Sequence, residues 1–100
     1  MDRTYLTLAV RDKTLLERAK AIGAEVKTWQ AIEDFLLPKG VIYSHEHAGG
    51  YMWEFHFRAD GCPSKHVQGS ASTNEIAHLF MLQQAIFAMY EHLHEKAGVQ

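Results

Sequence analysis

The stretch from Ser72 to Ala97, STNEIAHLFMLQQAIFAMYEHLHEKA, decides the fold, because it predicts one long helix around which the rest of the chain can assemble. Ser72 is a favourable N-cap residue, and Glu75 three positions later completes a capping box. The capping box satisfies backbone N–H groups that otherwise have no partner in the first turn. We therefore expect the helix to begin at Ser72.

Large apolar residues cover one side of this predicted helix. At about 100° per residue they span an arc of roughly 180°, which is wider than the roughly 100° stripe of an ordinary surface helix. We therefore expect this side to be mostly buried. The residues on the arc are Ile76, Leu79, Phe80, Leu82, Ile86, Phe87, Met89, Tyr90 and Leu93.

Small residues and histidines lie on the opposite side of the same helix. Two interpretations are open: alanine is there because it favours helix formation on a solvated face, or the seam lets a partner helix approach closely. The second interpretation predicts a surface for a protein partner or a second copy, formed by Ala77, His78, Met81, Ala85, Ala88 and His92. Polar residues interrupt the run before it reaches the roughly 20 apolar residues of a membrane span.

The length of 100 residues predicts a single globular domain over residues 1–100. A net charge of −2 argues against a general nucleic-acid binder, which needs positive charge to neutralise phosphates. Cys62 is the only cysteine, so no intrachain disulfide can form, and the N-terminus does not resemble a signal peptide. These features predict a cytoplasmic protein.

The first 40 residues predict two strands and two helices in alternation. Tyr5–Val10 alternates apolar and polar side chains, which is typical of a half-buried strand. Asp12 can cap a helix that runs to about Ile22 and ends at Gly23. A short strand, Ala24–Lys27, is then followed by a second helix, Trp29–Leu37, which Thr28 can cap and Pro38-Lys39-Gly40 ends.

Val41–Arg58 predicts a β-hairpin, and the length of its loop decides which side chains share a face. A two-residue turn at Gly49-Gly50 puts three histidines and Glu54 on one face. A three-residue loop instead groups the odd-numbered residues of both strands and separates polar from apolar side chains better. We favour the three-residue loop and expect Ala59–Ala71 to be a long connection without regular structure.

The predicted fold is α+β: a small, mostly antiparallel sheet, made of the N-terminal strand and the central hairpin, packs against two short helices and the long C-terminal helix. A parallel pairing of the first two strands would make it α/β. The predicted core is Leu6, Leu8, Leu16, Ile22, Ile32, Phe35, Trp53, Phe55, Phe57, Leu79, Leu82, Ile86 and Leu93.

Two sets of polar residues are candidate ligand sites. His45, His47, Cys62 and His66 are residue types that bind zinc, although no paired Cys-x-x-Cys motif is present. A second set, Lys65, His66, Ser70 and Thr73, precedes or opens the long helix, whose positive N-terminal end attracts anions. No catalytic residue set is evident.

All seven histidines lie in residues 41–100. Their protonation would move the charge of this part from −3 to +4, so we expect stability or assembly to depend on pH between about 5 and 7.

The sequence favours a non-enzymatic protein-binding module without a cofactor, acting as a homodimeric adaptor or as an inhibitor or modulator of a larger assembly. Small accessory proteins of phages are the class of proteins that we expect to act in this way. The alternative is a small zinc-binding protein or metal-dependent hydrolase that uses the His45, His47, Cys62 and His66 set.

Overall fold

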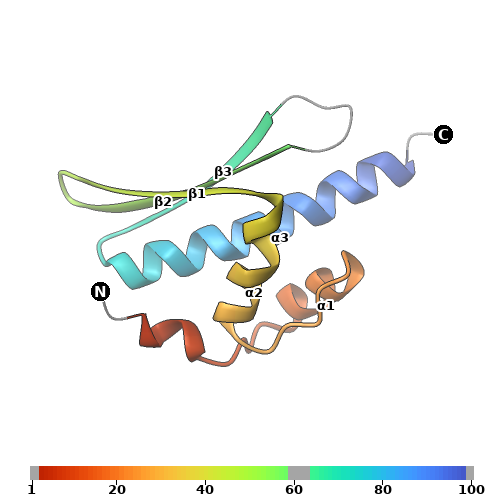
Figure 1. Cartoon of the computed structure of the whole chain (residues 1–100), viewed down its shortest axis with the longest axis horizontal. Coiled ribbons are helices and arrows are strands. Elements are labelled where there is room, and N and C mark those ends of the chain that lie inside the picture. The colour runs from red at the N-terminus through yellow and green to blue at the C-terminus, as the bar shows by residue number, and fades with distance from the viewer. Residues whose placement is uncertain (1–2, 59–63, 99–100) are drawn as a thin grey trace.

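The computed structural model describes residues 3–58 and 64–98, and it shows one antiparallel sheet lying over a long helix (Figure 1). The sheet has the strand order β1-β2-β3. The α+β class and the long C-terminal helix are therefore confirmed. The elements are η1 (Thr4–Thr7), α1 (Lys13–Ala21), α2 (Trp29–Leu36), η2 (Leu37–Lys39), β1 (Gly40–His47), β2 (Gly50–Arg58), β3 (Ser64–Ala71) and α3 (Asn74–Gly98), where η denotes a 3₁₀-helix.

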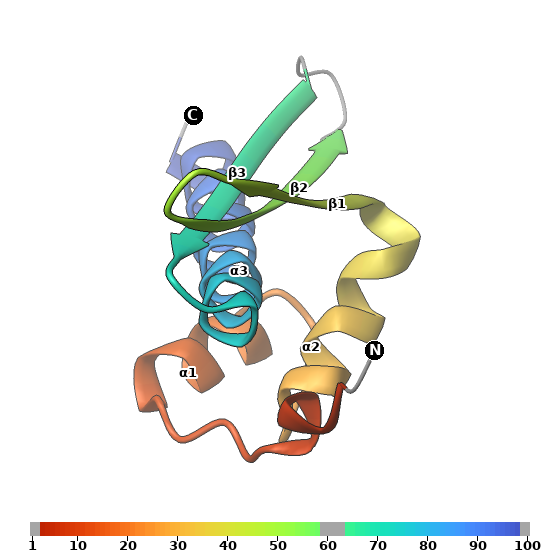
Figure 2. The same cartoon turned by 90° about the vertical axis from the view of Figure 1, so that its left-hand side faces the viewer.

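The helix α3 forms the middle layer of the molecule (Figure 2). Its upper side packs against β3 and β2, and its lower side packs against α1 and α2. Although α3 is long, its polar residues keep it from being apolar enough to cross a membrane, and the same is true of every other helix in the described part of the chain.

The predicted N-terminal strand is wrong. Thr4–Thr7 forms a 3₁₀-helix, and the alternation expected over this segment is absent, since Leu6 is buried whereas Leu8 is 56% exposed. A single isolated bridge joins Ala9 to Thr28, so the predicted strand Ala24–Lys27 does not form either. An alternating pattern makes a strand only where a neighbour pairs with it, and here the neighbouring segment pairs at one position.

The N-caps of the first two helices are confirmed. The Asp12 carboxylate accepts a hydrogen bond from the Leu15 amide at 3.2 Å, and the Thr28 hydroxyl accepts one from the Ala31 amide at 3.2 Å. Gly23, with φ of 94°, follows the first helix in the left-handed conformation that favours glycine. Local capping chemistry therefore fixes where these helices begin and where α1 ends.

The start of α3 is shifted by one residue from the prediction. Thr73, not Ser72, is the cap: its hydroxyl accepts from the Ile76 amide at 3.3 Å, and its carbonyl accepts from the Ala77 amide at 3.1 Å. The predicted capping box of Ser72 and Glu75 is therefore wrong. Both Ser and Thr can cap a helix, and in the structure Ser72 is in the bend that leaves β3.

The hairpin has a two-residue loop, Ala48-Gly49, so the favoured three-residue loop is wrong. His47 pairs with Gly50, and Gly49 takes a φ of 97°. This register puts odd-numbered residues of β1 beside even-numbered residues of β2. It therefore produces the grouping of faces that the other predicted register implied, with histidines and Glu54 on one face.

Most of the predicted connection after the hairpin is a strand. Ser64–Ala71 pairs with β2 along its whole length, with Val67 opposite Phe55. The expectation of irregular structure is therefore wrong for these eight residues. The segment SKHVQGSA has little intrinsic preference for a strand, and its pairing with β2 and its packing on α3 supply what local sequence does not.

The core is largely as predicted. Six predicted core residues are buried and five are half-buried against them, whereas Leu8 and Leu93 are exposed, so the core assignment of these two is wrong. The buried six are Leu6, Ile32, Phe55, Phe57, Leu82 and Ile86, and the half-buried five are Leu16, Ile22, Phe35, Trp53 and Leu79.

Candidate functional site

The seam of small residues on α3 faces this chain's own sheet. Ala77, His78, Met81 and Ala85, which were predicted to contact a partner, are each 0% exposed and are covered by this chain itself. The seam does allow a close approach, but the approaching element is β3. A Cβ atom on Gly69 would lie 2.4 Å from the Met81 nitrogen and 2.6 Å from the Ala77 carbonyl oxygen.

The last two members of the predicted seam are only partly covered. Ala88 and His92 are half-buried near the C-terminal half of α3. Ala88 helps to line a hollow between α3 and β3, and the Nδ1 atom of His92 is buried without a hydrogen-bond partner in the structure. Ala88 and His92 therefore do not form a continuous exposed surface.

The exposed apolar side of α3 lies elsewhere, beside β3. Ile76 is 48% exposed and Phe80 is 47% exposed, although both were expected in the buried arc. The face that α3 buries is rotated relative to the predicted arc because the sheet packs on the small residues, whose short side chains let the strand come close. One flank of α3 therefore exposes large apolar side chains to solvent.

The strand beside this flank has a free edge. β3 is the last strand of the sheet, and no strand in the described residues pairs with its outer side (Figure 2). The β3 edge and the exposed flank of α3 lie on the same side of the molecule. We call this surface the β3 face: the free edge of β3 together with Ile76, Phe80, Gln84, Phe87 and Glu91 of α3.

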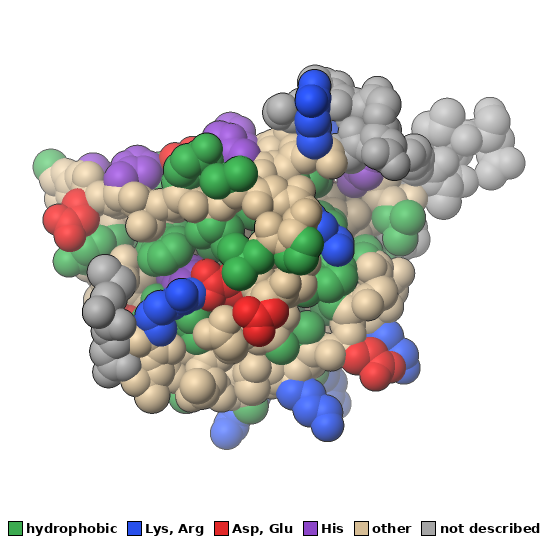
Figure 3. Space-filling view, viewed as in Figure 1, with side chains coloured by type: hydrophobic (Ala, Val, Ile, Leu, Met, Phe, Trp, Pro, Cys, Tyr) green, Lys and Arg blue, Asp and Glu red, His purple; other side chains and the backbone are tan. Residues whose placement is uncertain are grey.

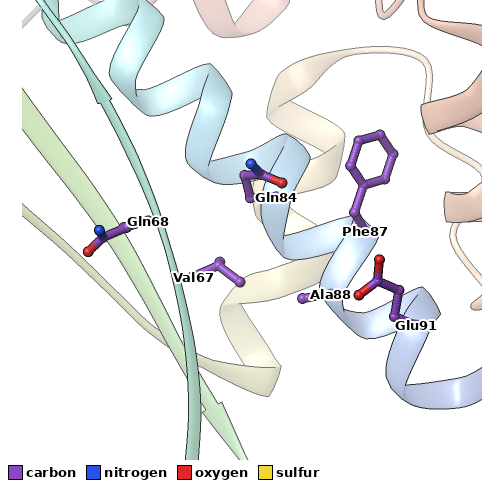
Figure 4. A pocket seen from close by; sticks show the side chains of 6 residues that line it. All are labelled: Val67, Gln68, Gln84, Phe87, Ala88 and Glu91. Atoms are coloured by element: carbon purple, nitrogen blue, oxygen red, sulfur yellow. The ribbon is translucent and has the colours of Figure 1, made fainter. Parts of the chain in front are cut away.

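A hollow of about 290 Å³ lies in the middle of the β3 face, between strand and helix (Figure 4). Val67 points from β3 toward α3, while Gln68 points to the other side of the strand. The Arg18 guanidinium of α1 lies over the Phe87 ring, 4.8 Å from its centre. The hollow is lined by Val67, Gln68, Gln84, Phe87, Ala88 and Glu91.

Histidines gather on the outer face of the sheet (Figure 3). The Glu54 carboxylate lies 3.0 Å from His45 Nε2 and 3.6 Å from His56 Nε2. The ring of His56 stacks on His66, with centroids 5.1 Å apart, and it meets the ring of Tyr43 edge-on at 5.2 Å. Sequence reasoning missed the pairing of His56 with His66 because it depends on β3.

The predicted zinc set is not brought together. His45 and His47 lie on β1, whereas His66 lies on β3 with His56 of β2 between them. Cys62 lies outside the described residues. Within residues 3–58 and 64–98, no group of three or more His, Cys, Asp or Glu side chains is arranged to hold a metal ion.

The members of the predicted anion set are spread along β3 and are not brought together. Lys65 lies near the start of β3 and Thr73 follows its end, so about 25 Å of extended chain lies between them. Ser70 and His66 are on the outer face of the sheet, whereas Lys65 is on the inner face. The Thr73 hydroxyl is already used as the cap of α3.

Among the residues that the structure describes, His78 is the only histidine with a strongly shifted pKa, and it lies in the interior. A 2.6 Å hydrogen bond joins His78 Nδ1 to the Tyr5 hydroxyl, and His78 Nε2 lies 3.4 Å from the Glu33 carboxylate. Arg3 forms an ion pair with Glu33. Burial, and secondarily the positive charge of Arg3, lowers the pKa of His78 to about 4.

This carboxylate, imidazole and hydroxyl sequence resembles a catalytic relay in order, but its environment favours a structural role. His78 is neutral at physiological pH and is 0% exposed. Burial also raises the pKa of the Tyr5 hydroxyl, so Tyr5 keeps its proton and is a poor nucleophile. The cluster therefore anchors the N-terminal 3₁₀-helix to α2 and α3.

Comparison with known proteins gives no match for this chain, whether with protein-family models, with curated proteins or with solved structures.

Proposed function

We propose that this chain is a non-enzymatic protein-binding module that acts as a homo-oligomeric adaptor or as an inhibitor or modulator of a larger assembly. The observation that carries the proposal is the β3 face, where a free strand edge and exposed apolar side chains lie together. The proposal concerns binding alone and requires no group on the outer sheet face to react.

A free strand edge can bind another chain through its backbone. Along an edge strand, every second residue points both its N–H and its C=O group outward. An added strand forms hydrogen bonds with these groups in a regular ladder. β3 is eight residues long and carries no proline, so its outer side can accept a strand over its full length. Backbone pairing would give such a complex affinity with little dependence on sequence.

The helix flank would then supply the specificity. Ile76 and Phe80 are close to one helical turn apart, and Phe80 lies against β3 near Gly69. In a strand added to β3, the side chains on the inner face of the sheet would reach Ile76, Phe80 and the hollow beside Phe87. Ile76 and Phe80 are each about half exposed, so covering the rest would supply about half of the roughly 1.5–3 kcal/mol that full burial of one such side chain is worth.

Site-specific photo-crosslinking tests the proposal. A photoreactive phenylalanine analogue is placed at Phe80, and a matched one at Val41, which is 52% exposed on the outer sheet face. In an extract of the producing cells, the Phe80 position should give a saturable crosslink to protein, either to this chain or to another. Excess unlabelled wild-type protein should compete for it, whereas a Phe80→Glu variant should not.

The control position decides the outcome. If Phe80 and Val41 give the same crosslinks, or if neither crosslinks any protein, the β3 face is not a protein-binding surface and the proposal fails.

A further inference from the structure

We infer that the partner of the β3 face is a second copy of this chain, joined edge to edge through β3 to make one continuous six-stranded sheet. The inference rests on the proposed function and names its partner. A second copy is chosen because the β3 face is complementary to itself under a two-fold rotation, as its geometry and charges show.

The strand and the helix of the β3 face share a midpoint, which a two-fold axis requires. Gln68 lies in the middle of β3, and Gln84 lies in the middle of the flank between Ile76 and Glu91. Both glutamines line the same hollow, so the two midpoints lie at the same level (Figure 4). One axis through this level therefore brings both the strands and the helices of two copies together.

The lengths of the two elements also match. Eight residues of strand extend about 27 Å, at 3.4 Å per residue. The 16 residues from Ile76 to Glu91 extend about 24 Å, at 1.5 Å per residue. The helices would therefore remain in contact along nearly the whole length over which the strands pair.

The antiparallel pairing of two β3 strands brings no like charges face to face. With the axis at Gln68, Lys65 is opposite Ala71 of the second copy and His66 is opposite Ser70. Val67 is opposite Gly69, which has no side chain for Val67 to meet across the pair. The edge residues of β3 are thus compatible with the same edge in reverse.

The two helices would run antiparallel beneath the joined strands, and this arrangement would bring one carboxylate, that of Glu91, near a positive helix end. Glu91 lies seven residues after Gln84, and Ala77 lies seven residues before it. Glu91 of one copy would therefore be level with the first turn of α3 in the other, whose positive dipole end attracts a carboxylate. Phe80 of one copy would be level with Ala88 of the other, where the hollow has room for a ring.

Sedimentation velocity over a concentration series tests the dimer directly. The wild-type protein should shift from monomer to dimer with concentration. Phe80→Glu should raise the dissociation constant at least about tenfold, because it puts a carboxylate in place of the apolar ring that would enter the hollow of the second copy. Val41→Glu is the matched control, since it adds the same charge at an exposed apolar position away from β3, and it should leave the dissociation constant unchanged.

A cysteine at the axis gives an independent test of the register. In a Cys62→Ser background, Gln68→Cys should form a disulfide-linked dimer under mild oxidation, because each Gln68 is opposite its own copy. Ser44→Cys, on the other edge of the sheet, should remain largely monomeric. A monomer at all concentrations, or equal crosslinking of both cysteines, would overturn the inference.

Failure of this inference is distinguishable from failure of the proposed function. A strictly monomeric protein whose Phe80 position still crosslinks specifically to a different protein would retain the binding function and exclude self-association. A monomer with no specific crosslink at Phe80 would exclude both.

Discussion

The imidazole of His78 lies flat on the indole of Trp53, with ring centroids 3.6 Å apart and planes inclined by 5°. The indole is itself fixed, because its N–H donates to the Asn74 side chain at 2.9 Å. This stack lies between the sheet and α3 at the place where the N-terminal segment also packs. A positive charge on His78 would therefore have to be accommodated in the interior.

The stability of the protein should decrease as the pH is lowered, because of His78. Its pKa is about 4 in the folded protein and about 6.5 in the unfolded chain, so only the unfolded state gains a proton between these values. Stability from this group is complete above about pH 6.5 and declines as the pH falls to about 4, by roughly 3 kcal/mol in total. Urea denaturation at several pH values measures the decline.

Variants assign this pH dependence to one residue. His78→Phe keeps a ring on Trp53 but cannot be protonated, so its stability should vary less between pH 4 and 6.5. His47→Gln removes an exposed histidine and should keep the wild-type slope. An equally steep slope in His78→Phe would show that another group is responsible.

Gly69→Ala should destabilise the protein by about 1–3 kcal/mol, as overpacking in a tight contact does. The added Cβ would meet backbone atoms of α3, at 2.4 and 2.6 Å, which cannot rotate away as a side chain can. Thermal or chemical denaturation measures the loss. Ser70→Ala, at the exposed neighbouring position, should change stability by less than about 0.5 kcal/mol. Equal stability of both variants would exclude a close β3–α3 contact at Gly69.

Leu82→Ala and Leu8→Ala compare two leucines that the sequence places together in the core. Leu82 is 0% exposed, so its truncation should cost about 2–5 kcal/mol. Leu8 is largely exposed, so its truncation should cost less than about 1 kcal/mol. Chemical denaturation of both variants gives the two values. Similar losses would mean that Leu8 packs against the core.

Local chemistry made the helices predictable. The caps at Asp12 and Thr28 act within three residues of the helix start, so each could be identified without knowledge of the fold. The cap of α3 was harder to identify, because Ser72 and Thr73 could each cap this helix. Only the way the chain leaves β3 decides in favour of Thr73.

Tertiary pairing made the strands less predictable. Tyr5–Val10 has the alternation of a strand but pairs at one position only, whereas Ser64–Ala71 lacks a strand signal but pairs along its length. The outcome for Ser64–Ala71 depends on its pairing with β2 and its packing on α3, whereas the outcome for Tyr5–Val10 depends on how far the segment around Thr28 pairs with it. Pattern alone could not weigh that contribution.

The candidate site was missed for a related reason. Hydrophobicity placed Phe80 in the interior and Ala77 on the surface, whereas the sheet requires small residues beneath Gly69. The large apolar residues were therefore displaced to the flank that forms the β3 face. Knowledge of β3, and of the glycine within it, would have been needed to orient α3.

The hydrogen bond between Tyr5 and His78 joins residues 73 positions apart, whereas β1, β2, β3 and α3 are each joined to the next along the chain. Contacts between sequence neighbours close small loops and form early, and distant contacts form late. We therefore expect the sheet and α3 to assemble first during folding, with the N-terminal segment docking last. Until it docks, the imidazole of His78 lacks its Tyr5 cover, so any form of the protein with this segment undocked should take up a proton at a higher pH than the folded protein does.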